Sequence, residues 1–108
     1  MCVGTTVDEG TLDLVIVALC ADYERRCSLI GSGFVSHRTE MEYRYLNFRV
    51  YNAAAEIVGE IYAPEMIKEI GARRGYAKSS IEHYSEKTYK VKKQQIKMNI
   101  ARKLHLID

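Results

Sequence analysis

The sequence predicts an all-α protein of one domain, in which a long N-terminal helical hairpin precedes a smaller C-terminal helical unit. Its length of 108 residues suits one domain. A single proline and 7 glycines argue against a β-sandwich or a disordered linker. Apolar residues recur at three- and four-residue steps, as amphipathic helices require. We expect a flexible tail over residues 1–10, the hairpin over residues 11–62 and the C-terminal unit over residues 64–108.

The first helix of the hairpin is expected to begin at Thr11, which can act as its N-cap, and to end at Gly31-Ser32-Gly33. Its main apolar stripe consists of Leu12, Val15, Leu19, Tyr23, Cys27 and Ile30. Neighbouring apolar residues widen this stripe near the start of the helix. A helix that is apolar over most of its circumference is buried or pairs with another chain, so we expect the hairpin to form a dimer.

The second helix is expected to begin with a capping box at Thr39 and Glu42 and to run to about Tyr62. It carries two adjacent apolar stripes. One stripe consists of Met41, Tyr45, Phe48, Asn52 and Ala55, and the other of Leu46, Val50, Ala53, Ile57 and Ile61. The run Ala53-Ala54-Ala55 has small side chains, so a neighbouring helix can approach it closely.

Three further helices are expected in the C-terminal unit. Pro64 suits the first position of a helix that Gly71 or Gly75 ends, and residues 76–84 are typical of a short helix. Ser85 then caps a last helix that runs to about Leu106. The buried stripe of this last helix consists of Tyr89, Ile96, Ile100, Leu104 and Ile107.

Charge is divided unevenly along the chain. Residues 1–63 carry five arginines against nine acidic residues, whereas residues 64–108 carry eleven Lys and Arg against five, giving −4 and +6. No acidic residue lies between Lys87 and Ile107. Such a split indicates a polyanionic partner for the basic half. A cationic helix that is presented with its N-terminus first is the kind of helix that a helix-turn-helix protein places on double-stranded DNA.

The last helix offers side chains that suit base and phosphate contact. With Tyr89 facing the core, Lys87, Lys90, Val91, Gln94 and Met98 point outward at 100° per residue. A glutamine can bind an adenine edge, a valine can contact a thymine methyl group, and lysines reach phosphate or guanine. Glu86 either accepts from a cytosine amine or repels the backbone. Upstream, Arg73, Arg74 and Lys78 are placed to clamp the DNA backbone.

Other function classes find little support. His37, His83 and His105 are far apart and have no companions at metal-ligand spacing, so we expect no metal, no cofactor and no enzyme. Three cysteines without a C-x-x-C pair favour a reducing compartment, which here means the cytoplasm. The start of the chain lacks the features of a secretory signal, and the longest apolar run is too short to span a membrane.

Several runs resemble a known family. Ser85-x-x-Thr88-Tyr89-x-x-x-Lys93, followed by Ile100-Ala101-x-x-Leu104-x-Leu106, resembles the C-terminal end of small phage and prophage transcription regulators of the RinA/ArpU type, which are distantly similar to region 4 of sigma factors. The resemblance implies a sequence-specific DNA-binding regulator in a bacterial host cell. It places Ser85, Glu86, Lys87, Thr88, Lys90 and Lys93 on the recognition helix. The full set of candidate DNA-contacting residues is Arg73, Arg74, Lys78, Ser85, Glu86, Lys87, Thr88, Lys90, Val91, Lys93, Gln94 and Lys97.

Two alternatives share these features. A small terminase subunit, which marks phage DNA for packaging, uses the same kind of DNA-binding unit but assembles as a ring rather than as a dimer. A helical interaction module would instead present its lysines to an acidic protein, such as host RNA polymerase, and would bind no DNA.

Overall fold

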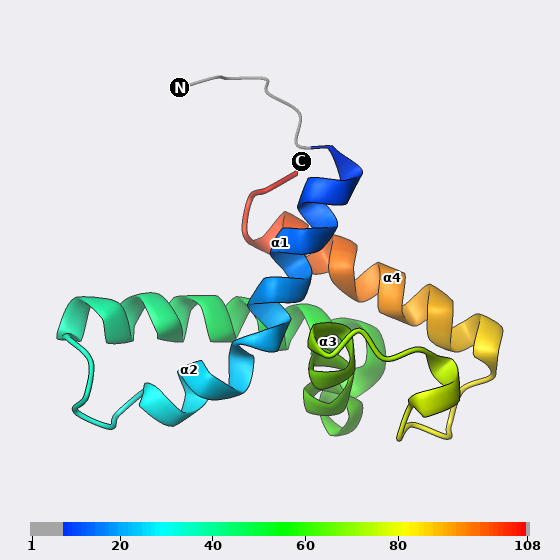
Figure 1. Ribbon diagram of the computed structural model, residues 1–108, viewed down its shortest axis with the longest axis horizontal. Coiled ribbons are helices and arrows are strands. Elements are labelled where there is room, and N and C mark those ends of the chain that lie inside the picture. The colour runs from blue at the N-terminus through cyan, green and yellow to red at the C-terminus, as the bar shows by residue number, and fades with distance from the viewer. Residues whose placement is uncertain (1–7, 108) are drawn as a thin grey trace.

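The computed structural model describes residues 8–107, and over that range the chain is helical and contains no strand (Figure 1). The all-α prediction is therefore confirmed. The elements are α1 (Glu9–Ala21), α2 (Tyr23–Leu29), α3 (His37–Gly71), the 3-10 helix η1 (Tyr76–Lys78) and α4 (Glu86–Lys103). No helix within these residues has both the length and the apolarity needed to cross a membrane.

The start of α1 differs from the expectation. Asp8 is the N-cap, and its carboxylate accepts a hydrogen bond from the Thr11 backbone N–H at 2.9 Å, so the prediction of Thr11 as the cap is wrong. A carboxylate both accepts the bond and favours the positive end of the helix dipole. The expected tail over residues 1–10 is wrong for residues 8–10, which begin the helix, and its residues 1–7 lie outside the described range.

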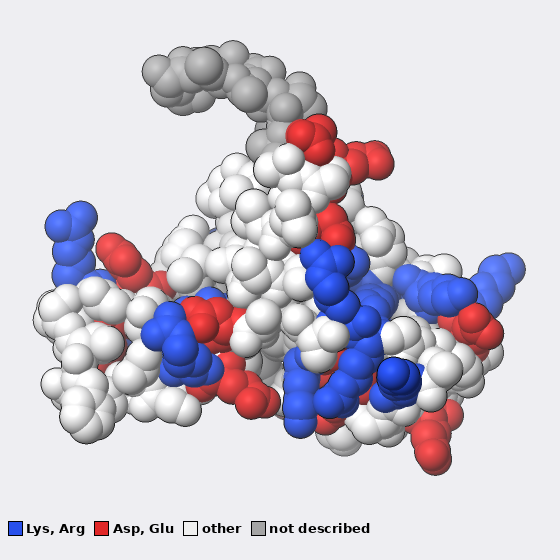
Figure 2. Space-filling model, in the orientation of Figure 1, with Lys and Arg blue, Asp and Glu red and all other residues white. Residues whose placement is uncertain are grey.

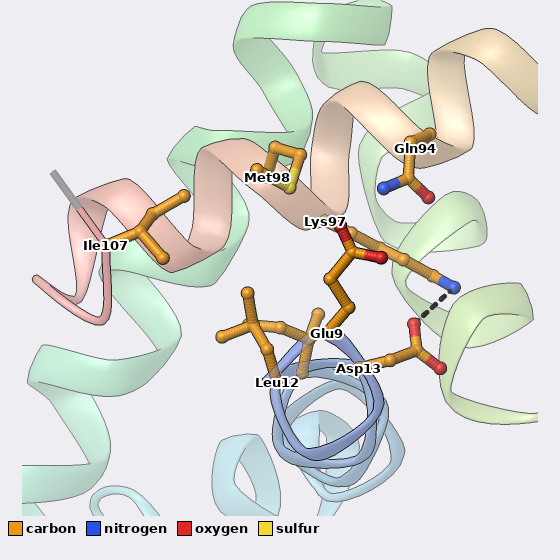
Figure 3. A pocket seen from close by; sticks show the side chains of 8 residues that line it. Glu9, Leu12, Asp13, Gln94, Lys97, Met98 and Ile107 are labelled. Carbon is orange, nitrogen blue, oxygen red and sulfur yellow. Dashed lines mark hydrogen bonds and ion pairs between the residues drawn. The ribbon is translucent and has the colours of Figure 1, made fainter. Parts of the chain in front are cut away.

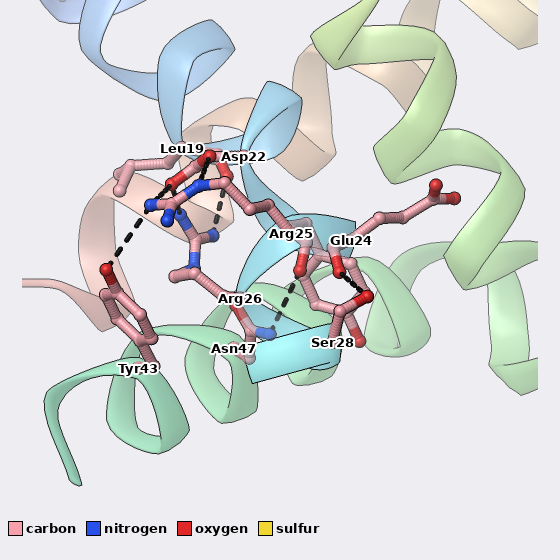
Figure 4. Close-up of polar contacts among 9 residues, drawn as sticks. Leu19, Asp22, Glu24, Arg25, Arg26, Ser28, Tyr43 and Asn47 are labelled. Atoms are coloured by element: carbon pink, nitrogen blue, oxygen red, sulfur yellow. Dashed lines mark hydrogen bonds and ion pairs between the residues drawn. The ribbon is translucent and has the colours of Figure 1, made fainter. Parts of the chain in front are cut away.

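The single helix expected up to Ile30 is divided at Asp22, which ends α1 and precedes α2. A buried polar joint holds this break (Figure 4). The guanidinium of Arg26 donates to the Leu19 carbonyl of α1 at 2.6 Å and to Asn47 Oδ1 of α3 at 2.6 Å, and it lies 3.5 Å from the Asp22 carboxylate. Buried charge is stable only when it is paired and hydrogen-bonded, so this arginine fixes α1, α2 and α3 together.

After α2 the chain reverses direction, and α2 lies alongside the first half of α3 (Figure 1). Ser36 caps α3 by accepting from the Thr39 N–H at 3.1 Å, so the expected start at Thr39 is wrong by one turn. The helix also runs past Tyr62 to Gly71. Its kink lies at Gly59, where φ is +83°, a value that glycine adopts readily. Two helices therefore meet within α3, as expected, but the break lies at Gly59 rather than after Tyr62, and Pro64 lies inside the second helix rather than at its first position.

The core lies where α1 and α4 pack against the middle and the second half of α3. The expected close approach at the alanine run is present, because Ala53 and Ala54 are fully buried and Asn99 of α4 donates to the Ala53 carbonyl at 3.1 Å. Gly71 permits a second close approach, since a Cβ atom there would lie 2.5 Å from the Ala21 backbone nitrogen.

The last part of the chain agrees with the sequence in its main helix only. Ser85 caps α4 as expected, and Tyr89, Ile96 and Ile100 are buried. The helix ends at Lys103, one turn before Leu106. The short helix expected over residues 76–84 is wrong, because only η1 is helical there and the rest is irregular.

Candidate nucleic-acid interface

A buried carboxylate positions the start of α4. Glu69 of α3 is fully buried and accepts hydrogen bonds from the Tyr89 hydroxyl at 2.7 Å and the Ser79 hydroxyl at 2.7 Å. It also accepts from the backbone N–H and the hydroxyl of Ser80, at 2.9 Å and 3.0 Å. These four bonds fasten the α3–α4 connection and the first turn of α4 to α3. They also explain why residues 79–81 leave the helical path that was expected for them.

The protonation states suit this arrangement. Burial raises the pKa of the Glu69 carboxyl, but the hydrogen bonds from Tyr89, Ser79 and Ser80 outweigh burial and hold its pKa below the usual value. Burial and the bond to Glu69 raise the pKa of Tyr89 to about 12. The pair is thus a charged acceptor and a neutral donor. Sequence reasoning missed Glu69; the available signal was an acidic residue placed beside Ile70 on an apolar helix face.

The outward side of the first half of α4 agrees with the sequence-based expectation. Lys87, Lys90, Val91 and Gln94 are exposed, and Val91 keeps 47% of its surface accessible. Lys90 lies 2.9 Å from Glu86 one turn earlier, in a pair whose side chains are both exposed. Such pairs contribute little to stability, so a phosphate can compete for this lysine.

The side chains of Ser85 and Thr88 hydrogen-bond to each other at the start of α4, and that of Ser85 also bonds to the backbone. The Ser85 hydroxyl accepts from the Thr88 N–H at 3.3 Å and donates to the Thr88 hydroxyl at 3.0 Å. Both residues are exposed, but their side chains serve the cap. Together with Glu86, they lie at the end of α4 that Figure 1 shows away from α1.

Two lysines of the candidate set turn toward the protein. Lys93 donates to the Arg74 carbonyl and lies 5.7 Å from the Tyr89 ring centroid, and burial together with the charge of Lys97 lowers its pKa. Lys97 is held by Asp13 of α1 at 2.8 Å. Both residues lie at the edge of the stripe centred on Tyr89, so their side chains are held by neighbouring elements, and their role in DNA contact stays a prediction.

The three cations upstream of α4 lie at different depths. Arg73 is exposed, with φ of +56°, and Lys78 is exposed at the end of η1. Arg74 is half-buried, and its guanidinium lies 4.0 Å from Glu65. Since its carbonyl also receives Lys93, Arg74 connects this segment to the flank of α4.

Electrostatic effects link the same segment to α1. The pKa of Asp13 is lowered, mainly by the hydrogen bond from Lys97 and further by the charges of Arg73 and Lys93. All three cations therefore lie within reach of one carboxylate.

We call the second half of α3, the α3–α4 connection and the first half of α4 the basic region. Six of its cations form no ion pair with any residue between 8 and 107: Lys68, Arg73, Lys78, Lys87, Lys92 and Lys93. Figure 2 shows Lys and Arg side chains gathered over the second half of α3 and over α4. Of the acidic residues in this region, Glu69 is buried, Glu65 and Glu86 are paired, and Glu60 and Glu82 are exposed.

The second half of α4 is covered by α1, and a groove of about 440 Å³ lies between them (Figure 3). Leu12, Met98 and Ile107 supply apolar surface, and the Asp13–Lys97 ion pair lies at one side. Met98, expected on the outward face, lines this groove and is half-buried. The side of the second half of α4 that faces α1 is therefore closed to a large partner, whereas Gln95 and Arg102 on its other side are exposed.

Comparison with known proteins gives no match: no protein-family model, no curated protein and no solved structure resembles this chain closely enough to be significant. Among residues 8–107, no three His, Cys, Asp or Glu side chains are grouped so that they could hold a metal ion.

Proposed function

We propose that this protein binds double-stranded DNA through the first half of α4, assisted by Arg73 and Lys78 of the α3–α4 connection. The observation that carries the proposal is the group of unpaired Lys and Arg side chains beside an exposed helix face that also presents Val91 and Gln94. Cations position the phosphate backbone, and the side chains between them read base edges in the major groove.

The way in which α4 is held differs from a standard helix-turn-helix unit. Such a unit joins its two helices by a turn of about three or four residues, whereas residues 72–85 separate α3 from α4 here. The proposal depends on the rigid placement of α4, which the bonds to Glu69 supply in place of a short turn. The resemblance to RinA/ArpU-type regulators supports the narrower proposal that the bound protein regulates transcription.

The cations set the expected strength of the salt effect. Lys87, Lys90, Arg73 and Lys78 are exposed, the first two on α4 and the other two on the connection that contacts it. If each neutralises one phosphate, the logarithm of the binding constant should fall with the logarithm of salt concentration with a slope of about −4. Lysine makes phosphate contacts readily but lacks the fork of arginine, so Gln94 is the main candidate for direct base reading.

The experiment is a titration of a labelled random-sequence duplex with the Lys87→Ala, Lys90→Ala double variant. We expect weaker binding and a salt slope reduced by about 2, because two phosphate contacts are lost. Helicity and melting temperature should stay near those of the wild type, since both side chains are exposed.

The matched control is the Arg25→Ala, Arg44→Ala double variant, which removes the same charge from exposed positions on α2 and the first half of α3, away from α4. It should retain most of the binding and nearly the full salt slope. Equal losses in the two double variants would mean that net charge alone drives binding and would contradict the assignment of α4.

A further inference from the structure

The first half of α3 carries an exposed apolar stripe. Met41, Tyr45 and Phe48 follow one another at four- and three-residue steps, so they lie on one face of the helix. They are 52%, 45% and 67% exposed. In the neighbouring stripe, Val50 and Ala53 are fully buried, Leu46 and Ile57 are half-buried, and only Ile61, beyond the kink, is exposed. The first half of α3 therefore has one apolar face that packs into the core and a second apolar face that is exposed to solvent.

The same helix provides a recess beside the stripe. An open groove of about 690 Å³ is lined by His37, Arg38, Met41, Glu42, Tyr45 and Leu46. Phe48 projects from the helix one turn beyond Tyr45, outside this groove. A projecting aromatic ring and an apolar recess therefore lie on opposite sides of Tyr45 along one helix.

We propose that the stripe is the interface with a second copy of this chain, with the two α3 helices packed antiparallel about Tyr45. A two-fold axis brings the same surface of both copies together, so the surface must complement itself. In this pairing, Phe48 of one copy, three residues after Tyr45, lies level with Glu42 of the other copy, three residues before Tyr45. Phe48 of each copy then meets the groove beside Met41 and Glu42 of its partner.

Charge supports a second copy as the occupant. The stripe is flanked by cations and anions in pairs, Arg38 with Glu42 at 3.7 Å and Arg44 with Glu40 at 3.0 Å. Two such surfaces do not repel each other, in contrast to two copies of the basic region.

The area is in the range that a dimer requires. Given the size of aromatic side chains, Met41, Tyr45 and Phe48 leave on the order of 350 Å² of apolar surface exposed. A standard interface buries about 800 Å² per partner, of which somewhat more than half is apolar. The stripe supplies most of that apolar part, and the flanking ion pairs supply a polar rim.

The test is the molar mass of the full chain across a range of protein concentrations, measured by sedimentation equilibrium without DNA. We expect the wild type to shift from monomer to dimer as concentration rises and Phe48→Glu to stay monomeric. Ile61→Glu, which changes an even more exposed apolar residue of α3 at 87% exposure, should dimerise like the wild type.

Three outcomes would overturn the proposal: a wild type that is monomeric throughout, a larger ring, or a Phe48→Glu variant that still dimerises. Circular dichroism of both variants verifies that they fold. Because the stripe and the start of α4 lie at opposite ends of the molecule (Figure 1), the test is independent of DNA binding. A monomer that binds random duplex in a salt-dependent way would refute the dimer and leave the proposed function intact.

Discussion

Removing one hydroxyl group tests whether the Glu69 cluster holds α4 in place. In Tyr89→Phe the ring stays in the core, but the 2.7 Å bond to the buried carboxylate of Glu69 is lost. Hydrogen bonds to charged groups contribute about 1.5–3 kcal/mol to stability. A domain of this size has roughly 5–15 kcal/mol in total, so the variant should be clearly less stable.

Urea denaturation followed by circular dichroism measures this loss. We expect the midpoint to fall by roughly 1–2 M with little change in slope. Tyr84→Phe is the control, because the Tyr84 hydroxyl makes no hydrogen bond with any residue between 8 and 107. A Tyr89→Phe midpoint within error of the control would refute the view that this bond anchors α4.

The other predictions concern packing, thiol exposure and pH. Gly71→Ala should destabilise the protein by about 1–3 kcal/mol in urea denaturation, because its Cβ would overlap the α1 backbone, while Gly75→Ala, with nothing within 4 Å, should have little effect. In mass-spectrometric mapping of alkylation, exposed Cys27 should react in the native protein and Cys20 should not, since burial raises the pKa of the Cys20 thiol to about 12. Hydrogen bonds hold the pKa of Glu69 below its usual value despite its burial. The ionised carboxylate therefore adds stability above about pH 4.3, and this stability is lost as the pH falls through the folded-state pKa. The difference in unfolding free energy between wild type and Glu69→Gln, measured by urea denaturation, should shrink over that pH range.

Local signals were sufficient where neighbouring residues decide the structure. Ser85 caps α4 because its hydroxyl reaches an N–H three residues away, and Tyr89, Ile96 and Ile100 are buried because their spacing places them on one face. Ala53 lies in a close helix contact because its side chain is small. None of these inferences requires knowledge of a distant partner.

The features that sequence reasoning missed depend on distant partners. Glu69 is recognisable as an anchor only when the donors ten, eleven and twenty residues later are brought to it, and their bonds remove the expected helix over residues 76–84. The side chains of Lys93 and Lys97 are held by the Arg74 carbonyl and by Asp13, partners that sequence spacing does not reveal. Arg26 divides the first helix by reaching a carbonyl of the preceding turns.

Helical periodicity also could not predict which of the two apolar stripes of α3 is buried. Both follow helical spacing, yet Val50 and Ala53 are buried whereas Met41 and Phe48 are exposed. Which stripe is covered depends on where α1 and α4 pack, and the α-helical repeat carries no information about that choice.

The binding of wild-type protein to random-sequence duplex DNA at several salt concentrations tests the central claim most directly. We predict measurable affinity at low salt that decreases linearly on a logarithmic plot with a slope of about −4. Absence of binding at the lowest salt concentration would contradict the proposed function and would assign the exposed lysines of α4 to an acidic protein partner.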